Sequence, residues 1–258
     1  MTIEPASKNR IKTWRKLQQS KYRKKNGQFI AEGLRCVNQI IENRIIDIDC
    51  VLVDKGTVNL NDLSVGSEKV YSVSSEDFIS IADTDNPQGV VAICNMPSDA
   101  DIKAILSTNG FLVAFDAIQD PGNMGTMIRT ASWFGVSGLI FGDGCVDQFH
   151  PKVVRSTAGA TGTLPFISSN LDGTFSALEN NGYQILLLDG STNSVSLKSK
   201  TPQKKTVLVV GNEGNGIDES YFKPNRTAVR IDGANDYVES LNAAVALSIG
   251  LFQLATTK

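Results

Sequence analysis

Short apolar runs alternate with helical stretches through the second half of the chain, and this alternation constrains the fold more than any other feature. The runs cover residues 111–115, 138–141, 185–188, 207–210 and 228–231. Each is almost continuously hydrophobic, which is typical of strands that are covered on both faces of a sheet. Helical stretches are expected between most of them, near residues 125–134, 152–158, 173–180 and 218–222, with a long one at 241–256. The pattern predicts an α/β fold with a mostly parallel sheet and helices on both faces.

A polar segment that contains proline, residues 95–99, divides the chain into two blocks. The first block opens with a basic segment and continues with apolar runs at residues 29–31, 48–53 and 90–94. Helical spacing at residues 34–43 and 75–82 separates these runs, which predicts a small α/β module. We therefore expect two domains, residues 1–97 and residues 98–258.

Cysteine spacing and the length of the apolar runs exclude several classes of protein. The four cysteines form no CxxC pair, which argues against a zinc site and against a disulfide framework. The longest nearly apolar run, residues 243–254, is shorter than the roughly 20 residues that a membrane span requires. No apolar core of a secretory signal follows the N-terminus. These features predict a soluble, cytoplasmic protein without a metal site.

The distribution of charge is more informative than the net charge of −2, which by itself disfavours a nucleic-acid partner. Nine basic residues and no acidic residue lie between Lys8 and Lys25, with Trp14 and Tyr22 interleaved. Cations attract phosphates and aromatic rings stack on unpaired bases. The segment is thus interpreted as an RNA-binding arm, with a solvated helix face as the alternative.

Polar residues follow the strands of the second block, where an open parallel sheet has its ligand crevice. Asn123 and Arg129 follow the first strand, Glu213 lies in a glycine-rich loop after the fourth, and Ser240 and Asn242 precede the last helix. Taken singly, the Asn and Ser residues could be helix N-caps, the arginine an ion-pair partner and the glutamate a solvated turn residue. Their order along the chain and their placement after strands point instead to a shared site.

The spacing of Asn123 and Arg129 sets a geometric condition on that site. Six positions on an α-helix turn the chain by about 600°, so the two side chains do not share a helix face. They can converge only if Asn123 still belongs to the loop, or if another chain completes the site.

Three ordered motifs in the second block resemble those of a known family. N-x-G-x-x-x-R at residues 123–129, G-N-E-G at residues 211–214 and S-L-N at residues 240–242 are similar to the motifs of the SpoU (TrmH-like) branch of the SPOUT RNA 2′-O-ribose methyltransferases. The resemblance covers about residues 110–256. The first block resembles the ribosomal-protein-like substrate-binding module that many members of the family carry.

The resemblance implies a fold and an assembly that composition and periodicity do not reveal. The sheet is expected to contain a deep trefoil knot, a rare exception to the rule that protein chains are unknotted. The protein is expected to be a homodimer with its active sites close to the subunit interface. A second chain would then supply the convergence that the spacing of Asn123 and Arg129 does not allow within one helix.

The resemblance also assigns roles by motif position. The catalytic positions of the family match Arg129, Asn123, Glu213, Ser240 and Asn242. The loops that bind S-adenosylmethionine match the backbone around Gly211, Ile231 and Leu241. The chain departs from the family at Ala243 and Ala244, where many members have Val-Ser.

The implied activity is methylation of a ribose 2′-hydroxyl in RNA, with S-adenosylmethionine as the methyl donor. Ribosomal RNA is the expected substrate, because the first block resembles the modules of rRNA-modifying relatives. Arg129 would stabilise the charge that develops on the 2′-oxygen, since a guanidinium holds its proton too firmly to be an obvious base. The alternatives are a transfer-RNA methyltransferase and a non-catalytic RNA-binding assembly factor. A nucleotide-dependent oxidoreductase is disfavoured, because the glycine spacing at residues 211–216 is not a dinucleotide-binding fingerprint.

Overall fold

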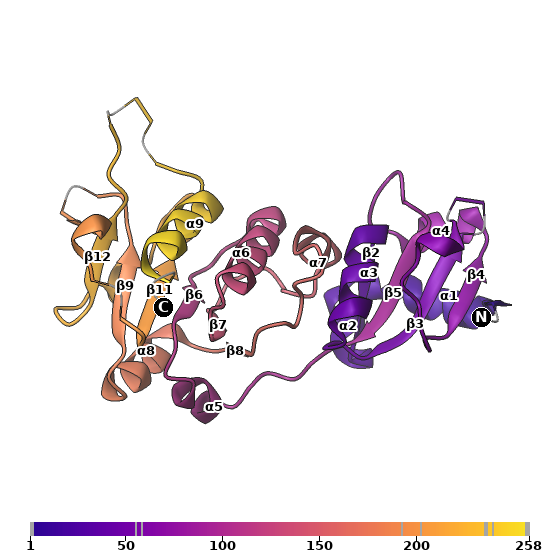
Figure 1. The fold of residues 1–258 in the computed structure, drawn as a ribbon, viewed down its shortest axis with the longest axis horizontal. Coiled ribbons are helices and arrows are strands. Elements are labelled where there is room, and N and C mark those ends of the chain that lie inside the picture. The colour runs from indigo at the N-terminus through magenta and orange to yellow at the C-terminus, as the bar shows by residue number, and fades with distance from the viewer. Residues whose placement is uncertain are drawn as a thin grey trace. The chain divides into compact units, whose positions relative to one another are not determined.

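The computed structural model describes residues 3–54, 56–57, 59–191, 193–201, 203–234, 237–238 and 240–255. The chain forms two compact units (Figure 1). The first unit consists of Met1–Ser98 together with Asp147–Thr163, and the second of Asp99–Val146 together with Leu164–Lys258. The SPOUT-like part of the chain thus contributes one internal segment to the first unit.

The first unit is built on a five-stranded sheet of order β1-β4-β3-β5-β2. Strands β1, β4 and β3 are parallel, whereas β5 runs antiparallel to β3 and β2. The strands are β1 (Ile3–Pro5), β2 (Gln28–Glu32), β3 (Ile48–Asp54), β4 (Val70–Val73) and β5 (Val90–Asn95). The helices are α1 (Lys8–Arg15), α2 (Ser20–Asn26), α3 (Leu34–Asn43), α4 (Ser75–Ile81) and α7 (Pro151–Ser156). Short 3-10 turns are η1 (Lys16–Gln18) and η2 (Leu60–Asp62).

The basic segment at the start of the chain folds into this unit instead of forming an arm. Ile11, Trp14 and Leu17 recur at helical spacing on α1 and η1 and are buried in the core of the unit. Trp14 is only 4% exposed, so the expectation that its ring stacks on RNA is wrong. Arg23 is 1% exposed and its Nη2 lies 2.5 Å from Asp147 Oδ2, which makes it a structural residue. The remaining cations of α1 and α2 lie on the surface.

The second unit contains a seven-stranded sheet in which every neighbouring pair of strands is parallel, with the order β10-β12-β9-β11-β6-β7-β8. The strands are β6 (Leu112–Phe115), β7 (Gly138–Phe141), β8 (Phe166–Ser168), β9 (Gln184–Leu188), β10 (Val195–Ser196), β11 (Thr206–Val210) and β12 (Thr227–Arg230). The helices are α5 (Ile102–Ser107), α6 (Pro121–Trp133), α8 (Leu171–Asn180) and α9 (Ala243–Leu254). The α/β fold with a parallel sheet is therefore confirmed.

Helices cover both faces of this sheet. Helices α5 and α8 pack on one face, where Ile105 and Phe175 join a core cluster with Ala114, Val207 and Val209. Helices α6 and α9 lie on the opposite face (Figure 1). Side chains on both faces of the central strands are thus buried, as the continuous hydrophobic runs of these strands predict.

Two predicted helices differ from the observed ones. The stretch at residues 218–222 forms only the 3-10 turn η4 (Glu219–Tyr221). The helix predicted near residues 125–134 begins earlier, at Pro121, because the Asp120 side chain caps it. Among the described residues, no helix has the length and hydrophobicity needed to cross a membrane.

Candidate active site

The connection from β6 to α6 places polar groups at the carboxyl edge of the parallel sheet. Asp120 Oδ1 accepts a hydrogen bond of 2.7 Å from the backbone N–H of Asn123, and Pro121 occupies the first helical turn. A proline at that position loses no helical hydrogen bond, because its N–H would be unpaired anyway. Asn123 therefore lies inside the helix, and its interpretation as the N-cap is wrong.

The loop after β11 is a compact turn whose shape depends on glycine. A Cβ atom on Gly211 would lie 2.3 Å from backbone atoms of Gly216 and Ile217, so no other residue fits there. Gly216 has a φ of +72°, a conformation that side chains disfavour. Asn212 and Gly216 exchange two backbone hydrogen bonds of 2.9 and 3.0 Å, which close the turn.

Two residues that sequence reasoning did not select join this loop to the β6–α6 connection. The side-chain amide of Asn212 donates to the carbonyl of Ala117 at 2.7 Å, and its oxygen accepts from the N–H of Gly214 at 2.9 Å. Asp116 accepts from the N–H of Asp218 at 2.8 Å, and burial raises the pKa of the Asp116 carboxyl. Asp116 directly follows β6 and Asn212 lies two residues after the end of β11, and this placement after a strand was the available signal.

Glu213 holds the first turn of α6. Its carboxylate accepts hydrogen bonds from the backbone N–H groups of Gln119 and Asp120, at 3.3 and 3.2 Å. Its Oε1 also accepts from the side-chain amide of Asn123 at 3.1 Å. A negative charge is favourable at this end of a helix, where backbone N–H groups are unpaired.

Asn242 extends this arrangement to the third segment. Its Oδ1 caps α9 by accepting from the N–H groups of Ala244 and Val245, at 2.9 and 3.3 Å. Its Nδ2 donates to Asn123 Oδ1 at 3.0 Å. Asn242, Asn123 and Glu213 thus form a chain of hydrogen bonds, which we call the amide chain. Each amide both accepts and donates, so the orientation of both groups is fixed.

The amide chain joins three of the predicted catalytic residues, whereas the other two lie elsewhere. Arg129 is exposed on α6, about 120° around the helix axis from Asn123. Within the part of the chain that the structure describes, no hydrogen bond or ion pair of the Arg129 side chain is found. Ser240 is exposed in the segment before α9. The structure therefore does not bring Arg129 to the amide chain within one subunit.

The predicted cofactor positions lie at the same edge of the sheet. Gly211 directly follows β11, Ile231 directly follows β12, and Leu241 directly precedes the cap of α9. Among the described residues, no backbone hydrogen bond of Ile231 or Leu241 is found outside the strand ladders. Peptide groups in this state can donate to and accept from a ligand, so the loops fit a nucleoside-like cofactor.

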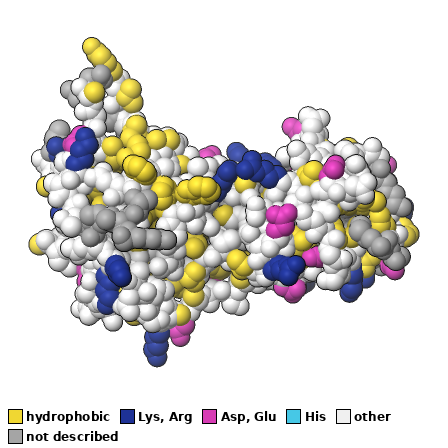
Figure 2. Space-filling view, in the orientation of Figure 1, with side chains coloured by type: hydrophobic (Ala, Val, Ile, Leu, Met, Phe, Trp, Pro, Cys, Tyr) yellow, Lys and Arg dark blue, Asp and Glu magenta, His cyan; other side chains and the backbone are white. Residues whose placement is uncertain are grey.

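A cavity of about 380 Å³ lies between α6 and α9, next to the amide chain. Asn123 and Asn242 form its polar end, and Val245, Ile249 and Phe252 form its apolar side. Hydrophobic side chains also gather on the surface over α9 (Figure 2). Within the described residues no cluster of three or more side chains suited to a metal ion occurs. The site therefore offers amides, one carboxylate and an apolar wall.

Comparison with known families gives two matches along the chain. Residues 110–252 match the SpoU rRNA Methylase family, and residues 8–92 match the MRM3-like substrate binding domain. The first match contains the residues of the amide chain together with Arg129. The second lies within the first unit.

Individual relatives align over nearly the whole chain. The chain is 33% identical over 256 residues to the 23S rRNA (guanosine(2553)-2′-O)-methyltransferase RlmP of Bacillus subtilis, with 98% of each protein covered. It is similar in structure to a TrmH-family protein of Porphyromonas gingivalis, with a TM-score of 0.83, 27% identity and coverage of 98% and 99%. An rRNA methyltransferase of Sinorhizobium meliloti, solved with bound AdoMet, gives a TM-score of 0.81, 28% identity and coverage of 98% and 96%.

Proposed function

The chain belongs to the SpoU rRNA Methylase family, and we propose that it methylates a ribose 2′-hydroxyl of 23S ribosomal RNA. It is an RNA methyltransferase that uses S-adenosylmethionine. The ribosomal substrate is supported by the name of the B. subtilis relative, which aligns with both units. The proposed location of the protein is the cytoplasm, because its proposed substrate is ribosomal RNA.

The observation that carries the proposal is the amide chain. It connects the β6–α6 connection, the loop after β11 and the cap of α9, three segments that are far apart in the sequence. Side chains held in one orientation by both of their neighbours are suited to position a reacting hydroxyl. A merely structural cap would need only the contacts from Asn242 to the α9 backbone.

Gly211, Ile231 and Leu241 are proposed to hold the cofactor through their backbone groups. When bound, S-adenosylmethionine supplies a methyl group that its sulfonium has already activated for transfer. The chain's own task is to align the ribose hydroxyl and to stabilise charge on its oxygen as the proton leaves. Arg129 is proposed to stabilise that negative charge, with Asn123, Glu213, Ser240 and Asn242 orienting the reacting groups.

We infer that Arg129 acts in a homodimer, because its own helix turns it away from the amide chain. An exposed apolar surface supports this inference. Trp133 on α6 is 85% exposed, and Val245 and Phe252 on α9 are 47% and 68% exposed. Large apolar side chains exposed on two helices that pack together are typical of a protein contact. A partner seated on α6 and α9 would lie beside Asn123 and Asn242, where it could complete the site. The trefoil knot stays a prediction that follows from the family.

Mapping of 2′-O-methyl groups in total RNA from cells with and without the gene tests the proposed substrate. We expect one ribose of 23S rRNA to lose its methyl group when the gene is removed. Loss from a transfer RNA alone would instead assign a transfer-RNA methyltransferase. Unchanged methylation together with RNA binding would assign a non-catalytic assembly factor.

A further inference from the structure

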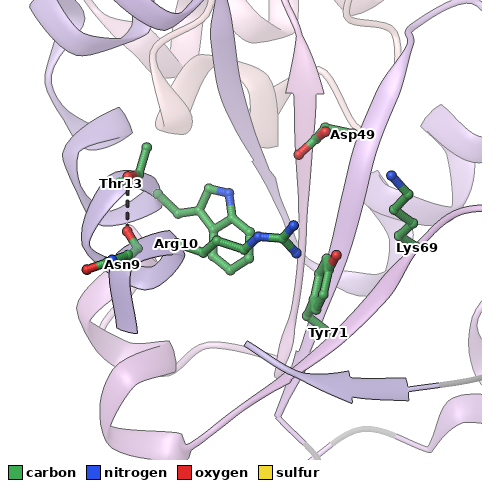
Figure 3. Close-up of a pocket in the computed structure, with 7 residues that line it drawn as sticks. Asn9, Arg10, Thr13, Asp49, Lys69 and Tyr71 are labelled. Carbon is green, nitrogen blue, oxygen red and sulfur yellow. Dashed lines mark hydrogen bonds between the residues drawn. The ribbon is translucent and has the colours of Figure 1, made fainter. Parts of the chain in front are cut away.

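A cavity in the first unit lies outside the proposed active site. It has a volume of about 260 Å³ and is lined by Asn9, Arg10, Thr13, Trp14, Asp49, Lys69 and Tyr71. Sites for drug-sized ligands have volumes of roughly 300–1,000 Å³, so this cavity suits a smaller group such as a single base. Figure 3 shows the charged ends of Arg10, Asp49 and Lys69 around one opening above Tyr71.

The floor of the cavity consists of two buried rings, and a flat cation lies over one of them. Trp14 and Tyr71 are 4% and 8% exposed, with ring centroids 5.9 Å apart. The Arg10 guanidinium lies over the Tyr71 ring, with its central carbon 4.6 Å from the ring centroid. Arg10 is nevertheless an exposed residue, which leaves its side chain accessible to a ligand. A planar cation held on a buried ring is a ready stacking platform.

A β-bulge directs Asp49 into the same cavity. The register between β3 and β5 shifts between Ile48 and Cys50, which leaves Asp49 as the extra residue. In a regular strand Asp49 would point to the face opposite Cys50. The bulge allows both to lie on the face of Tyr71, and bulges commonly redirect a side chain in this way. The Asp49 carboxylate then lines the same cavity as two cations, Arg10 and Lys69.

We propose that this cavity binds one unpaired nucleotide of the RNA substrate, with its base stacked on Arg10, its edge facing Asp49 and its phosphate facing Lys69. The inference rests on the proposed function, which supplies RNA as the ligand. Proteins read unpaired RNA bases by stacking them on arginine or aromatic planes and by hydrogen bonds to their edges. A carboxylate only accepts hydrogen bonds, so Asp49 selects a base edge with donors. Guanine fits best, because its N1–H and its 2-amino group are adjacent.

The test measures equilibrium binding of a short single-stranded RNA containing unpaired guanosine to the full-length protein. Arg10→Ala and Arg10→Lys should each weaken binding about tenfold, the range expected for one stacked base. The lysine variant keeps the charge and removes only the planar group. Arg35→Ala is the matched control. Arg35 is an exposed arginine on α3, a helix that packs against β2 and β5 away from the cluster around Trp14. It should change binding by about twofold or less.

Asp49→Asn gives a readout that a merely structural role would not move. If Asp49 faces a base, the substitution weakens binding, and replacing guanosine by inosine in the probe weakens binding to the wild type but not to the variant. If Asp49 only repels phosphate, the substitution tightens binding, and the proposal is overturned. Equal effects of Arg10→Ala and Arg35→Ala would overturn it as well.

Methyl transfer to 23S rRNA by the wild-type protein is measured in parallel. Active transfer combined with binding that does not depend on the cavity refutes this inference and leaves the proposed function intact. Absent transfer combined with cavity-dependent binding refutes the proposed function alone.

Discussion

The substitution Asn123→Asp replaces one hydrogen bond of the amide chain by a repulsion and preserves the other hydrogen bonds. The Asn123 amide nitrogen lies 3.1 Å from Glu213 Oε1, so the variant sets two carboxylate oxygens at that separation. The hydrogen bond from Asn242 survives, because its acceptor oxygen is retained. The change therefore isolates the link between Asn123 and Glu213.

The structure allows the cost of this change to be worked out. Two unit charges about 3.1 Å apart in water repel by about 1.3 kcal/mol, and the lost hydrogen bond adds about 1 kcal/mol at an exposed site. A new negative charge in the first turn of α6 offsets about 0.3–1 kcal/mol. We expect a net loss of about 1–2 kcal/mol in the free energy of unfolding. Each kcal/mol of lost stability lowers the midpoint temperature of thermal unfolding by about 2–4 °C in a protein of this size.

Thermal unfolding at several pH values is the assay. Repulsion raises the folded-state pKa of the new carboxylate pair above the unfolded value, so the loss is present at neutral pH and shrinks as the pH falls through the raised pKa. Asn170→Asp is the matched control, because Asn170 caps α8 through an oxygen that aspartate retains. If Asn123→Asp and Asn170→Asp unfold at the same temperature at pH 7, the contact between Asn123 and Glu213 is refuted. A loss of stability that does not change with pH would refute it as well.

Three further outcomes follow from the geometry. Trp133→Asp or Phe252→Asp should convert the proposed dimer to monomers in sedimentation and abolish methyl transfer, and active monomers would contradict the shared site. Asp116→Asn should gain thermal stability relative to the wild type as the pH rises through the raised pKa of Asp116, whereas a difference constant with pH would refute its burial cost. Replacing both Lys24 and Lys25 by Ala should lower the salt dependence of RNA binding by about one to two units of slope, and an unchanged slope would mark a solvated face.

Sequence reasoning predicted the parallel sheet because its central strands are continuous apolar runs. It missed β8 and β10, which have only three and two residues and too little hydrophobic pattern to detect. It also interpreted the basic segment as an RNA-binding arm, although Ile11, Trp14 and Leu17 recur at helical spacing there. The dense charge obscured an amphipathic helix whose apolar stripe is narrow.

The residues of the candidate site were predicted from local motifs, whereas the contacts between them were not. The motifs selected Asn123, Glu213 and Asn242, which the structure joins through contacts across about ninety or more residues of sequence. The cap of α6 was assigned to the wrong residue, because Asp120 and Asn123 are both capping types and only the proline between them distinguishes the start. The pairing of Arg23 with Asp147 had no sequence signal, because nothing local links them.

Transfer of label from S-adenosylmethionine to unmodified 23S rRNA, followed by alkaline hydrolysis, tests the central claim most directly. A methyl group on the ribose 2′-oxygen blocks cleavage of the adjacent phosphodiester, so the wild-type product should carry its label in an alkali-resistant dinucleotide. Arg129→Ala should bind the cofactor nearly as well and yield almost no labelled product. Label released in mononucleotides, or comparable turnover by Arg129→Ala, would contradict the account.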